Sequence, residues 1–375
     1  MFGRRVTLFH LMGIAVRADA SFLIILALVT WSLARGLFPQ LYPDLSLNAY
    51  WMMAAAGAII LFLSVVIHEL SHSVVARRYG IPIKGITLFV FGGVAEMHDE
   101  PPSPKSELLM ALAGPAASVV ISVVFLTAGA AAGALGWRPE VVGVIQYVGF
   151  TNGLLAVFNM LPAFPLDGGR VLRAIIWWRK GEIRAATRVA SNAGNIFGWL
   201  LIGAGFYTLI TGNIIGGIWW LLIGSFLRHA ATMSYQQVVV RQMLEGQPVT
   251  RFMNPAPITV SRSIPVSELV DEYIYRHHHS FFPVVSGDRL VGCVTAHDVK
   301  KLPREEWDQQ TVGAIAHECD ASNTIGVAED AMQALTKMGR VGAKRLMVVD
   351  GDRLAGLVGS KDLLQFLSLK MELEK

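Results

Sequence analysis

Charged residues and cysteines are both scarce in this chain. Charged side chains make up 16% of its 375 residues, against about 25% in an average soluble protein. The deficit lies before Arg241, and the residues that follow have the composition of a soluble domain. Two cysteines are present, Cys293 and Cys319, and both fall in this C-terminal part. Their number indicates no disulfide framework, and a reducing cytosol would suit them.

A large excess of charge of one sign is also missing. The formal net charge of +4 is too small to indicate a nucleic-acid partner, and the basic residues lie in loops that flank apolar segments. The pattern of a signal peptide is also missing from the first residues of the sequence. The first 20 residues have a basic start but no long apolar core followed by a cleavage site. We therefore expect them to belong to the mature protein.

Long apolar runs fill the part before Arg241. A bilayer core about 30 Å thick requires roughly 20 apolar residues in a helix. Six such segments are present, at Ser21–Phe38, Tyr50–Ile67, Leu108–Leu135, Val141–Leu161, Ala193–Thr211 and Ile214–Leu227. Gly114 and Pro115 interrupt the third, and a tight turn at Gly212–Asn213 joins the last two. The sequence thus predicts a mostly α-helical, polytopic membrane domain with six transmembrane helices over residues 1–235.

Lysine and arginine are unevenly divided between the two ends of these predicted helices. Cytoplasmic loops of membrane proteins have an excess of both residues. They gather at three places, namely Arg4, Arg5 and Arg17 at the N-terminus, Arg77, Arg78, Lys84 and Lys105 after the second helix, and Arg170, Arg173, Arg179, Lys180, Arg184 and Arg188 after the fourth. The intervening connections contain Arg138, with Arg35 at a boundary. We therefore predict a multi-pass protein of the cell membrane. Its N-terminus, the HELSH end of the second helix and the C-terminal half are predicted to be cytoplasmic.

The C-terminal part contains an internal repeat. FFPVVSGDRLVGCVTAHDVKKL (Phe281–Leu302) aligns with RLMVVDGDRLAGLVGSKDLLQF (Arg345–Phe366). Each segment predicts a strand, a Gly-Asp turn, a second strand and a helix that begins near Asp298 or Asp362. A further strand and helix precede each copy. This order resembles a tandem pair of cystathionine-β-synthase-type (CBS) domains. It implies a soluble α/β unit with a connector at 236–250 and domains at 251–310 and 311–370.

The motif HELSH (His68–His72) ends the second apolar run. Residues i and i+4 share one face of a helix, so His68 and His72 can bind the same metal ion. Glu69 can then reach the open position of the metal and act as general base toward a water molecule, as in zinc proteases. Two histidines facing lipid headgroups are the alternative. Ionisable residues at the end of a membrane helix are costly, which favours a functional site.

A catalytic zinc ion needs a third protein ligand, and Asp167 is the candidate. It follows the uncharged run Val141–Leu166, within NMLPAFPLDGGR (Asn159–Arg170). Pro162 and Pro165 cannot sustain a regular helix, and Gly168–Gly169 lets the backbone turn. Asp167 is therefore predicted at an unwound helix end, on the same side of the membrane as His68 and His72. An N-cap for the helix that follows is the alternative.

Four short motifs of the first half belong together. They are HELSH, FGGVAEM (Phe91–Met97), AGPAAS (Ala113–Ser118) and NMLPAFPLDGGR. Over about residues 45–185, this combination resembles the site-2 protease family of intramembrane zinc metalloproteases. The resemblance implies three zinc ligands, His68, His72 and Asp167, and a catalytic glutamate, Glu69. It also implies that Asn159 binds substrate or stabilises the oxyanion, for which a helix–helix hydrogen bond is the alternative.

The function implied by this resemblance is intramembrane proteolysis by a zinc metalloendopeptidase. The substrate is expected to be a membrane protein whose transmembrane helix unwinds and is cut near the cytoplasmic boundary of the lipid bilayer. An anti-sigma factor or another single-span regulator is the family-level expectation, within regulated intramembrane proteolysis. A CBS-regulated transporter or channel, with the His–Asp cluster as a metal-transit site, is the alternative function.

A strand-like segment, Leu88–Met97, lies near the predicted site. It could bind an unwound substrate by strand addition, and a hairpin buried in protein is the alternative. Two roles are possible for Glu96, namely a role in the predicted site or a structural ion pair with Arg77 or Arg78.

CBS pairs usually bind an adenine nucleotide such as ATP in the cleft between the copies. In CBS domains, which this repeat resembles, a Thr or Ser contacts the phosphate of the nucleotide and an Asp three residues later binds the ribose hydroxyls. This spacing gives Thr295 and Asp298 in the first copy and Asp362 in the second, where Gly359 has no hydroxyl. A ligand-free homodimerisation module, with both aspartates as helix caps, is the alternative. The run His277–His279 could bind metal or sense pH, but a solvated helix end is favoured.

Overall fold

The computed structural model describes residues 5–90, 92–97 and 100–373, and divides the chain into two compact units, Met1–Gln236 and Gln237–Lys375. Among the described residues, six helical segments are long and apolar enough to cross a membrane. They are Ala20–Leu41, Leu47–Arg78, Pro104–Ala134, Pro139–Asn159, Ile183–Ile210 and Ile214–Leu244. The fold class predicted for the first half, with its six spans, is confirmed.

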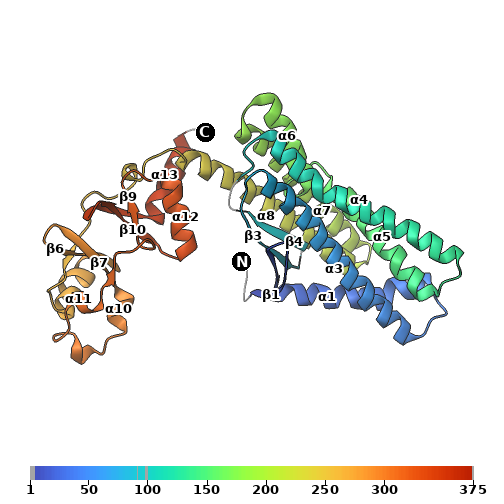
Figure 1. Ribbon diagram of the computed structural model, residues 1–375, viewed down its shortest axis with the longest axis horizontal. Helices are drawn as coiled ribbons and strands as arrows, with labels where there is room; N and C mark the ends of the chain where they lie inside the picture. The colour runs from blue at the N-terminus through green and yellow to red at the C-terminus, as the bar shows by residue number, and fades with distance from the viewer. Residues whose placement is uncertain (1–4, 91, 98–99, 374–375) are drawn as a thin grey trace. The chain divides into compact units, whose positions relative to one another are not determined.

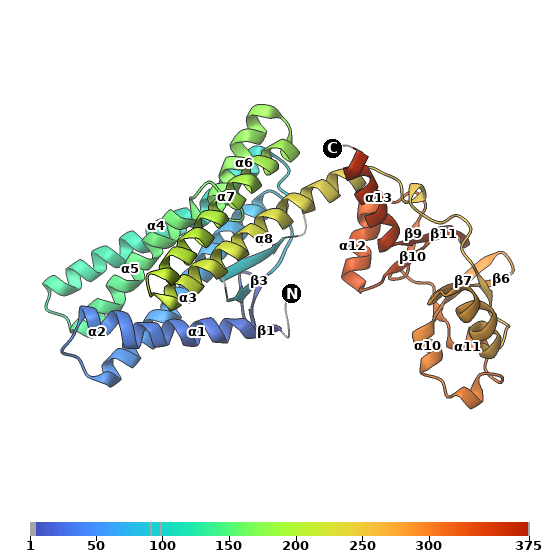
Figure 2. The same ribbon diagram turned by 180° about the vertical axis from the view of Figure 1, so that it is seen from behind.

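The first unit combines these helices with a small sheet. Its strands are β1 (Arg5–Leu11), β2 (Ile14–Asp19), β3 (Ile83–Phe89) and β4 (Gly92–Met97). Its helices are α1 (Ala20–Ser32), α2 (Phe38–Leu41, after a π-helical turn at Leu33–Leu37), α3 (Leu47–Arg78), α4 (Pro104–Ala134), α5 (Pro139–Asn159), α6 (Asp167–Lys180), α7 (Ile183–Ile210) and α8 (Ile214–Leu244). Helices α3, α4 and α5 pack against one another and run side by side in both ribbon views (Figure 1, Figure 2).

Four helices differ clearly from their predicted extents. Helix α3 continues beyond Ile67 to Arg78. Helix α4 continues through Gly114 and Pro115, where an interruption was expected. A proline removes one backbone hydrogen bond, and membrane helices tolerate that loss. Helix α7 begins at Ile183 rather than Ala193, and α8 ends at Leu244 rather than Leu227. Hydropathy marks only the apolar part of a helix, and these two helices extend into polar turns.

The sheet of the first unit lies across α3. Its strand order is β1-β2-β3-β4, with β2 and β3 parallel and the other neighbours antiparallel. One face packs Val16, Ala18 and Leu88 against Val66 of α3. Residues 88–97 were predicted as one strand-like segment, but a turn separates β3 from β4; Phe91 lies outside the described residues. The β1–β2 hairpin was not predicted, because its sequence resembles a basic flank of the first apolar run.

The second unit contains the predicted repeat. Its main elements are β5 (Val260–Ser261), α9 (Val266–Glu268) with a π-helical segment (Leu269–Tyr275), β6 (Phe281–Ser286), β7 (Arg289–Thr295), α10 (Ala296–Lys300), α11 (Val312–Ile315), β8 (His317–Glu318), β9 (Thr324–Gly326), α12 (Ala331–Val341), β10 (Arg345–Asp350), β11 (Arg353–Gly359) and α13 (Ser360–Leu373). Short 3₁₀ turns lie at Val249–Arg251 and Arg304–Glu306.

Both copies of the repeat have the same strand arrangement. In the first, β5 is parallel to β6 and β6 is antiparallel to β7; in the second, β9, β10 and β11 are related in the same way. The sheets of the two copies share an apolar cluster in which Leu290 and Cys293 pack with Met347. The predicted α/β class of this unit is confirmed, and the boundary between the two predicted domains stays a prediction.

Candidate metal centre

Three side chains from two helices meet inside the first unit. His68 and His72 lie on α3, and Asp167 is the first residue of α6. The Nε2 atoms of the two histidines are 3.2 Å apart, and each lies 3.2 Å from Oδ2 of Asp167. Both histidines are buried. In the part of the chain that the structure describes, this is the one cluster of three metal-ligating side chains.

Helix α4 holds the far sides of both imidazole rings. Nδ1 of His72 lies 2.6 Å from the carbonyl oxygen of Met110, and Nδ1 of His68 lies 2.9 Å from Oγ of Ser118. Because a carbonyl oxygen only accepts, His72 donates from Nδ1, and in the neutral ring the Nε2 lone pair is left for a metal ion. Outer hydrogen bonds of this kind orient the ring and fix its tautomer.

Gly114 of α4 lies directly against the same two rings. A Cβ atom at this position would overlap Nε2 of both His72 and His68. Glycine therefore allows the helix to approach the metal-binding nitrogens. The motif Ala113–Ser118, to which the sequence alone assigned no role, supplies both this close approach and the hydroxyl that contacts His68.

Asp167 stands at an unwound helix end, as predicted. Residues 160–166 between α5 and α6 form turns and bends, and the N-cap of α6 is Leu166, so the N-cap alternative for Asp167 is wrong. Burial acts to raise the pKa of Asp167, but the neighbouring imidazoles of His68 and His72 outweigh it and hold the pKa below its ordinary value. The two imidazoles thus favour the ionised form of Asp167, which is the form that binds a metal ion.

The three side chains line a cavity of about 560 Å³. Glu69, Asn159 and Arg170 line it as well, so the structure brings together every site residue predicted in the first half. Most of the remaining wall is apolar and comes from the sheet and α8, through Phe89, Val90, Gly93, Val94, Ala95, Trp219, Ile223, Phe226, Leu227 and Ala230. The cavity thus combines a group of polar, metal-ligating side chains with a mostly apolar lining.

Glu69 and Asn159 reach this cavity from different helices, α3 and α5. Glu69 lies against β4, because a Cβ atom built on Gly93 would be 2.7 Å from Cγ of Glu69. It lies outside the cluster of ligand atoms, as a general base should. Asn159 is the last residue of α5. Its side chain forms no hydrogen bond with any described residue, so the helix–helix alternative finds no support.

Comparisons with known proteins agree with this geometry. The sequence model of peptidase family M50 matches residues 56–134 and 131–202, and that of the CBS domain matches residues 249–305. The chain is 32% identical over 366 residues to a Mycobacterium tuberculosis protein named zinc metalloprotease Rip3, covering 97% of this chain and 93% of that protein. The chain belongs to peptidase family M50.

Two further M50 relatives come from Methanocaldococcus jannaschii. The protein named zinc metalloprotease MJ0392 is 29% identical, over 97% of this chain and 96% of its own length. A solved site-2 protease from the same organism is 30% identical, covers 62% of this chain and 95% of that chain, and has a TM-score of 0.44. This M50 protein is a multi-pass zinc metalloprotease of the site-2 type with a CBS domain, and the transporter alternative is set aside.

The donor set of this M50 protein fits zinc. Two imidazole nitrogens and one carboxylate oxygen form a three-ligand catalytic set, which leaves a fourth position for water or substrate. The histidine rings already point their Nε2 atoms toward Oδ2 of Asp167. Gly114 keeps the intervening space clear of a side chain.

Glu96 is not part of the M50 site. It accepts hydrogen bonds from Arg5, from Arg17 at 3.2 Å and from the Thr87 hydroxyl at 2.8 Å, on the opposite face of the sheet from α3. The suggested pairing with Arg77 or Arg78 is wrong. Arg77 instead donates to the carbonyl oxygen of Met12, at 2.7 Å. Sequence distance concealed the true partners, because β1 and β2 were not predicted.

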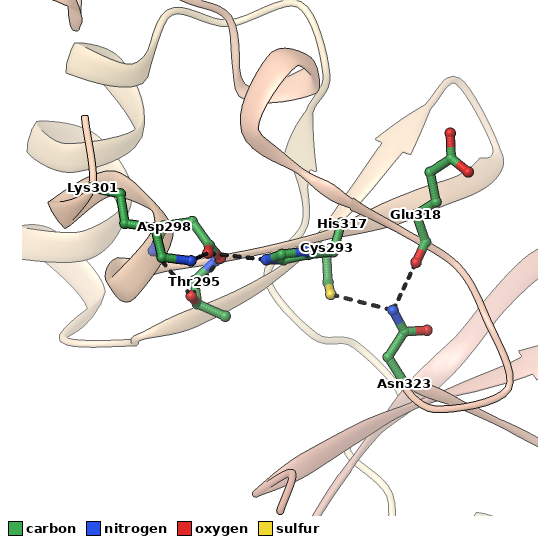
Figure 3. A network of polar contacts seen from close by, with 7 residues as sticks. All are labelled: Cys293, Thr295, Asp298, Lys301, His317, Glu318 and Asn323. Carbon is green, nitrogen blue, oxygen red and sulfur yellow. Dashed lines mark hydrogen bonds and ion pairs between the residues drawn. The ribbon is translucent and has the colours of Figure 1, made fainter. Parts of the chain in front are cut away.

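In the CBS unit, Thr295 and Asp298 are bound to each other. The Thr295 hydroxyl donates to Oδ2 of Asp298 at 2.6 Å, and Nζ of Lys301 and Nε2 of His317 lie 3.1 and 3.0 Å from Oδ1 (Figure 3). Burial acts to raise the pKa of Asp298, but these hydrogen bonds lower it to about 2. Sequence reasoning missed His317, which reaches Asp298 only because β8 pairs with β7.

The second predicted half-site differs. Asp362 is exposed and accepts a hydrogen bond from the backbone N–H of Gly359 at 2.9 Å, so only the backbone half of the first copy's arrangement is repeated. The run His277–His279 is exposed throughout. No metal-ligating cluster includes these histidines among the described residues, which agrees with a solvated helix end.

Proposed function

We propose that this M50 protein cleaves a membrane-protein substrate in its transmembrane helix, near the cytoplasmic boundary of the bilayer. The observation that carries the proposal is the cluster of His68, His72 and Asp167, whose ligand atoms lie 3.2 Å apart in a cavity shared with Glu69. The proposed substrate class is a single-span regulator such as an anti-sigma factor, cut during regulated intramembrane proteolysis.

In this proposal, His68, His72 and Asp167 hold the zinc ion. When bound, zinc supplies a Lewis acid that polarises the scissile carbonyl and makes water easier to deprotonate. A carboxylate oxygen of Glu69 accepts the proton of the attacking water and then delivers it to the amide nitrogen of the leaving segment. The amide of Asn159 donates a hydrogen bond to the substrate carbonyl oxygen as negative charge develops there.

Substrate binding is proposed along β4. This strand is at the edge of the sheet, and no other described strand pairs with its outer side. A transmembrane segment must lose its helical hydrogen bonds before attack, and strand addition replaces them with bonds to an edge strand. Gly93 lies against Glu69, so a segment paired with β4 would run past the proposed general base.

Regulation is proposed to come from residues 236–370, with a connector at 236–250 and CBS domains at 251–310 and 311–370. Support comes from the family match at residues 249–305 and from the matching strand arrangement of the second copy. Because His317 and Lys301 already occupy Oδ1 of Asp298, an adenine nucleotide would have to displace them to bind there. Homodimerisation through this unit is proposed alongside, and the Lys and Arg distribution supports a cytoplasmic location for it.

The decisive test separates metal binding from proton transfer. Wild type, Glu69→Gln and Asp167→Ala are purified in detergent, and both zinc content and cleavage of a single-span substrate are measured. Glu69→Gln is expected to keep its zinc while cleavage falls by roughly 10²-fold or more, and Asp167→Ala is expected to lose both. Turnover by Glu69→Gln at the wild-type rate would contradict the proposed general base. Full zinc retention in Asp167→Ala would remove Asp167 from the ligand set.

A further inference from the structure

A buried ion pair joins α4 to α6 beside the metal centre. Nε of Arg173 donates to Oε1 of Glu107 at 2.5 Å, and Nη2 of the same guanidinium contacts the same oxygen. The side chain of Glu107 is 0% exposed and that of Arg173 is 9% exposed. The guanidinium carbon also lies 5.1 Å from the ring centre of Phe164. Arg173 is therefore held from two sides.

Each end of this pair is close in sequence to a component of the metal centre. Glu107 lies on α4 just before Met110, whose carbonyl binds His72, and the same helix supplies Gly114 and Ser118. Arg173 lies on α6, the helix that begins with Asp167. Helix α4 contacts both histidines of α3, and Asp167 begins α6. The spacing of the three ligands therefore depends in part on how α4 and α6 are held together.

Stability alone is a poor explanation for such a pair. Two charges removed from water lose more hydration than their attraction returns in many cases, and apolar side chains of similar volume often stabilise a core equally well. Oε2 of Glu107 is buried and has no hydrogen-bond partner among the described residues. A costly arrangement at this position indicates a requirement for defined geometry.

We propose that Glu107 and Arg173 are positioning residues for the zinc site. Their ion pair fixes α6, and with it Asp167, against the segment of α4 that orients His68 and His72. Breaking the pair lets Asp167 move relative to the two imidazoles, which weakens zinc binding without removing any ligand. This inference rests on the proposed ligand set of His68, His72 and Asp167.

Zinc affinity of the full-length protein in detergent provides the test. Affinity is measured by competition with a chromogenic chelator, and thermal unfolding of the zinc-free form is recorded for every variant. Arg173→Met leaves a buried carboxylate unpaired, so it is accompanied by Glu107→Gln and by the double variant Glu107→Met/Arg173→Met, which removes both charges. Arg138→Met is the matched control, because the Arg138 side chain that pairs with Glu140 is 82% exposed.

The double variant is expected to unfold near the wild-type temperature yet to bind zinc about tenfold more weakly, the range seen when outer partners of metal ligands are lost. Arg138→Met is expected to bind zinc as wild type does. Wild-type zinc affinity in the double variant would overturn the positioning role and leave the pair a purely structural contact. Asp167→Ala is measured in parallel, because full zinc binding by that variant would overturn the ligand set itself.

Discussion

At the scale of single residues, Gly114 shows how little space the metal centre leaves. Because an added Cβ would overlap both Nε2 atoms, Gly114→Ala must push α4 away from α3 or rotate the imidazoles. We expect this variant to bind zinc at least about tenfold more weakly. Zinc content of the purified protein is the measurement. Gly133→Ala on the same helix is the control, since its Cβ would meet only Val142 at 4.0 Å. Equal zinc content in the two variants would contradict the close approach of α4.

Asp298 gives a prediction about pH. Its pKa of about 2 lies below the ordinary value near 3.9. The stability that it contributes is therefore complete above about pH 4 and is lost as the pH falls through about 2. Asp298→Asn is expected to destabilise the second unit at pH 7 and to flatten its stability profile between these two pH values.

Acid unfolding followed by hydrogen exchange in the second unit tests this expectation. Asp352→Asn is the control, because the Arg289–Asp352 ion pair is about 70% exposed on both sides and such pairs contribute little. A pH profile of Asp298→Asn that runs parallel to the wild-type profile would show that Thr295, Lys301 and His317 do not stabilise the ionised carboxylate.

At the scale of elements, β4 and α3 meet at the proposed general base. A Cβ on Gly93 would be 2.7 Å from Cγ of Glu69, so Gly93→Ala shifts either the strand or the carboxylate. We expect cleavage to slow by about 10²-fold, the cost of misplacing a reacting group by roughly 1 Å, while zinc content stays unchanged. Gly203→Ala on α7, where an added Cβ meets nothing within 4 Å, should cleave as wild type does. Loss of zinc from Gly93→Ala would place the strand against the ligands instead.

Elements also show where sequence reasoning succeeds and where it stops. The six spans were predictable because hydropathy and helix length are properties of a local segment, and His68, Glu69 and His72 followed from spacing on one helix. Asp167 could be predicted because a charged residue directly after a long apolar run stands out in the sequence. Contacts between residues far apart in the sequence could not be predicted. Glu96 on β4 contacts Arg5 on β1 and Arg17 on β2 because these strands belong to one sheet. Asp298 contacts His317 because β8 pairs with β7. Neither contact leaves a local pattern.

At the scale of the whole molecule, the proposed orientation can be checked by cysteine labelling. In a background with Cys293→Ser and Cys319→Ser, single cysteines at Lys84, Gly181 and Gln247 are expected to react from the cytoplasmic side. Cysteines at Asp44 and Trp137 are expected to react from the opposite side. One transmembrane helix separates each of these two positions from Lys84, and one separates Trp137 from Gly181. An impermeant maleimide applied to intact cells and to inverted vesicles distinguishes the two. Labelling of the Gln247 position in intact cells would reverse the assignment of the second unit.

Helix α8 runs without a break from Ile214 to Leu244 (Figure 2). Five of its residues line the proposed catalytic cavity, namely Trp219, Ile223, Phe226, Leu227 and Ala230. Its residues from Gln237 onward belong to the second unit. In a continuous helix, each residue is rotated by about 100° around the helix axis relative to the one before it. One alanine inserted after Met233 therefore rotates the residues that follow it by about 100° around the helix axis, whereas seven inserted alanines return them to within roughly 20° of the original direction.

If the proposed nucleotide signal travels as a torque along α8, ATP should alter cleavage in wild type and in the seven-alanine variant but not in the one-alanine variant. Cleavage assays with and without ATP measure this, and an undiminished ATP response with one alanine would mean that the signal does not depend on the phase of α8.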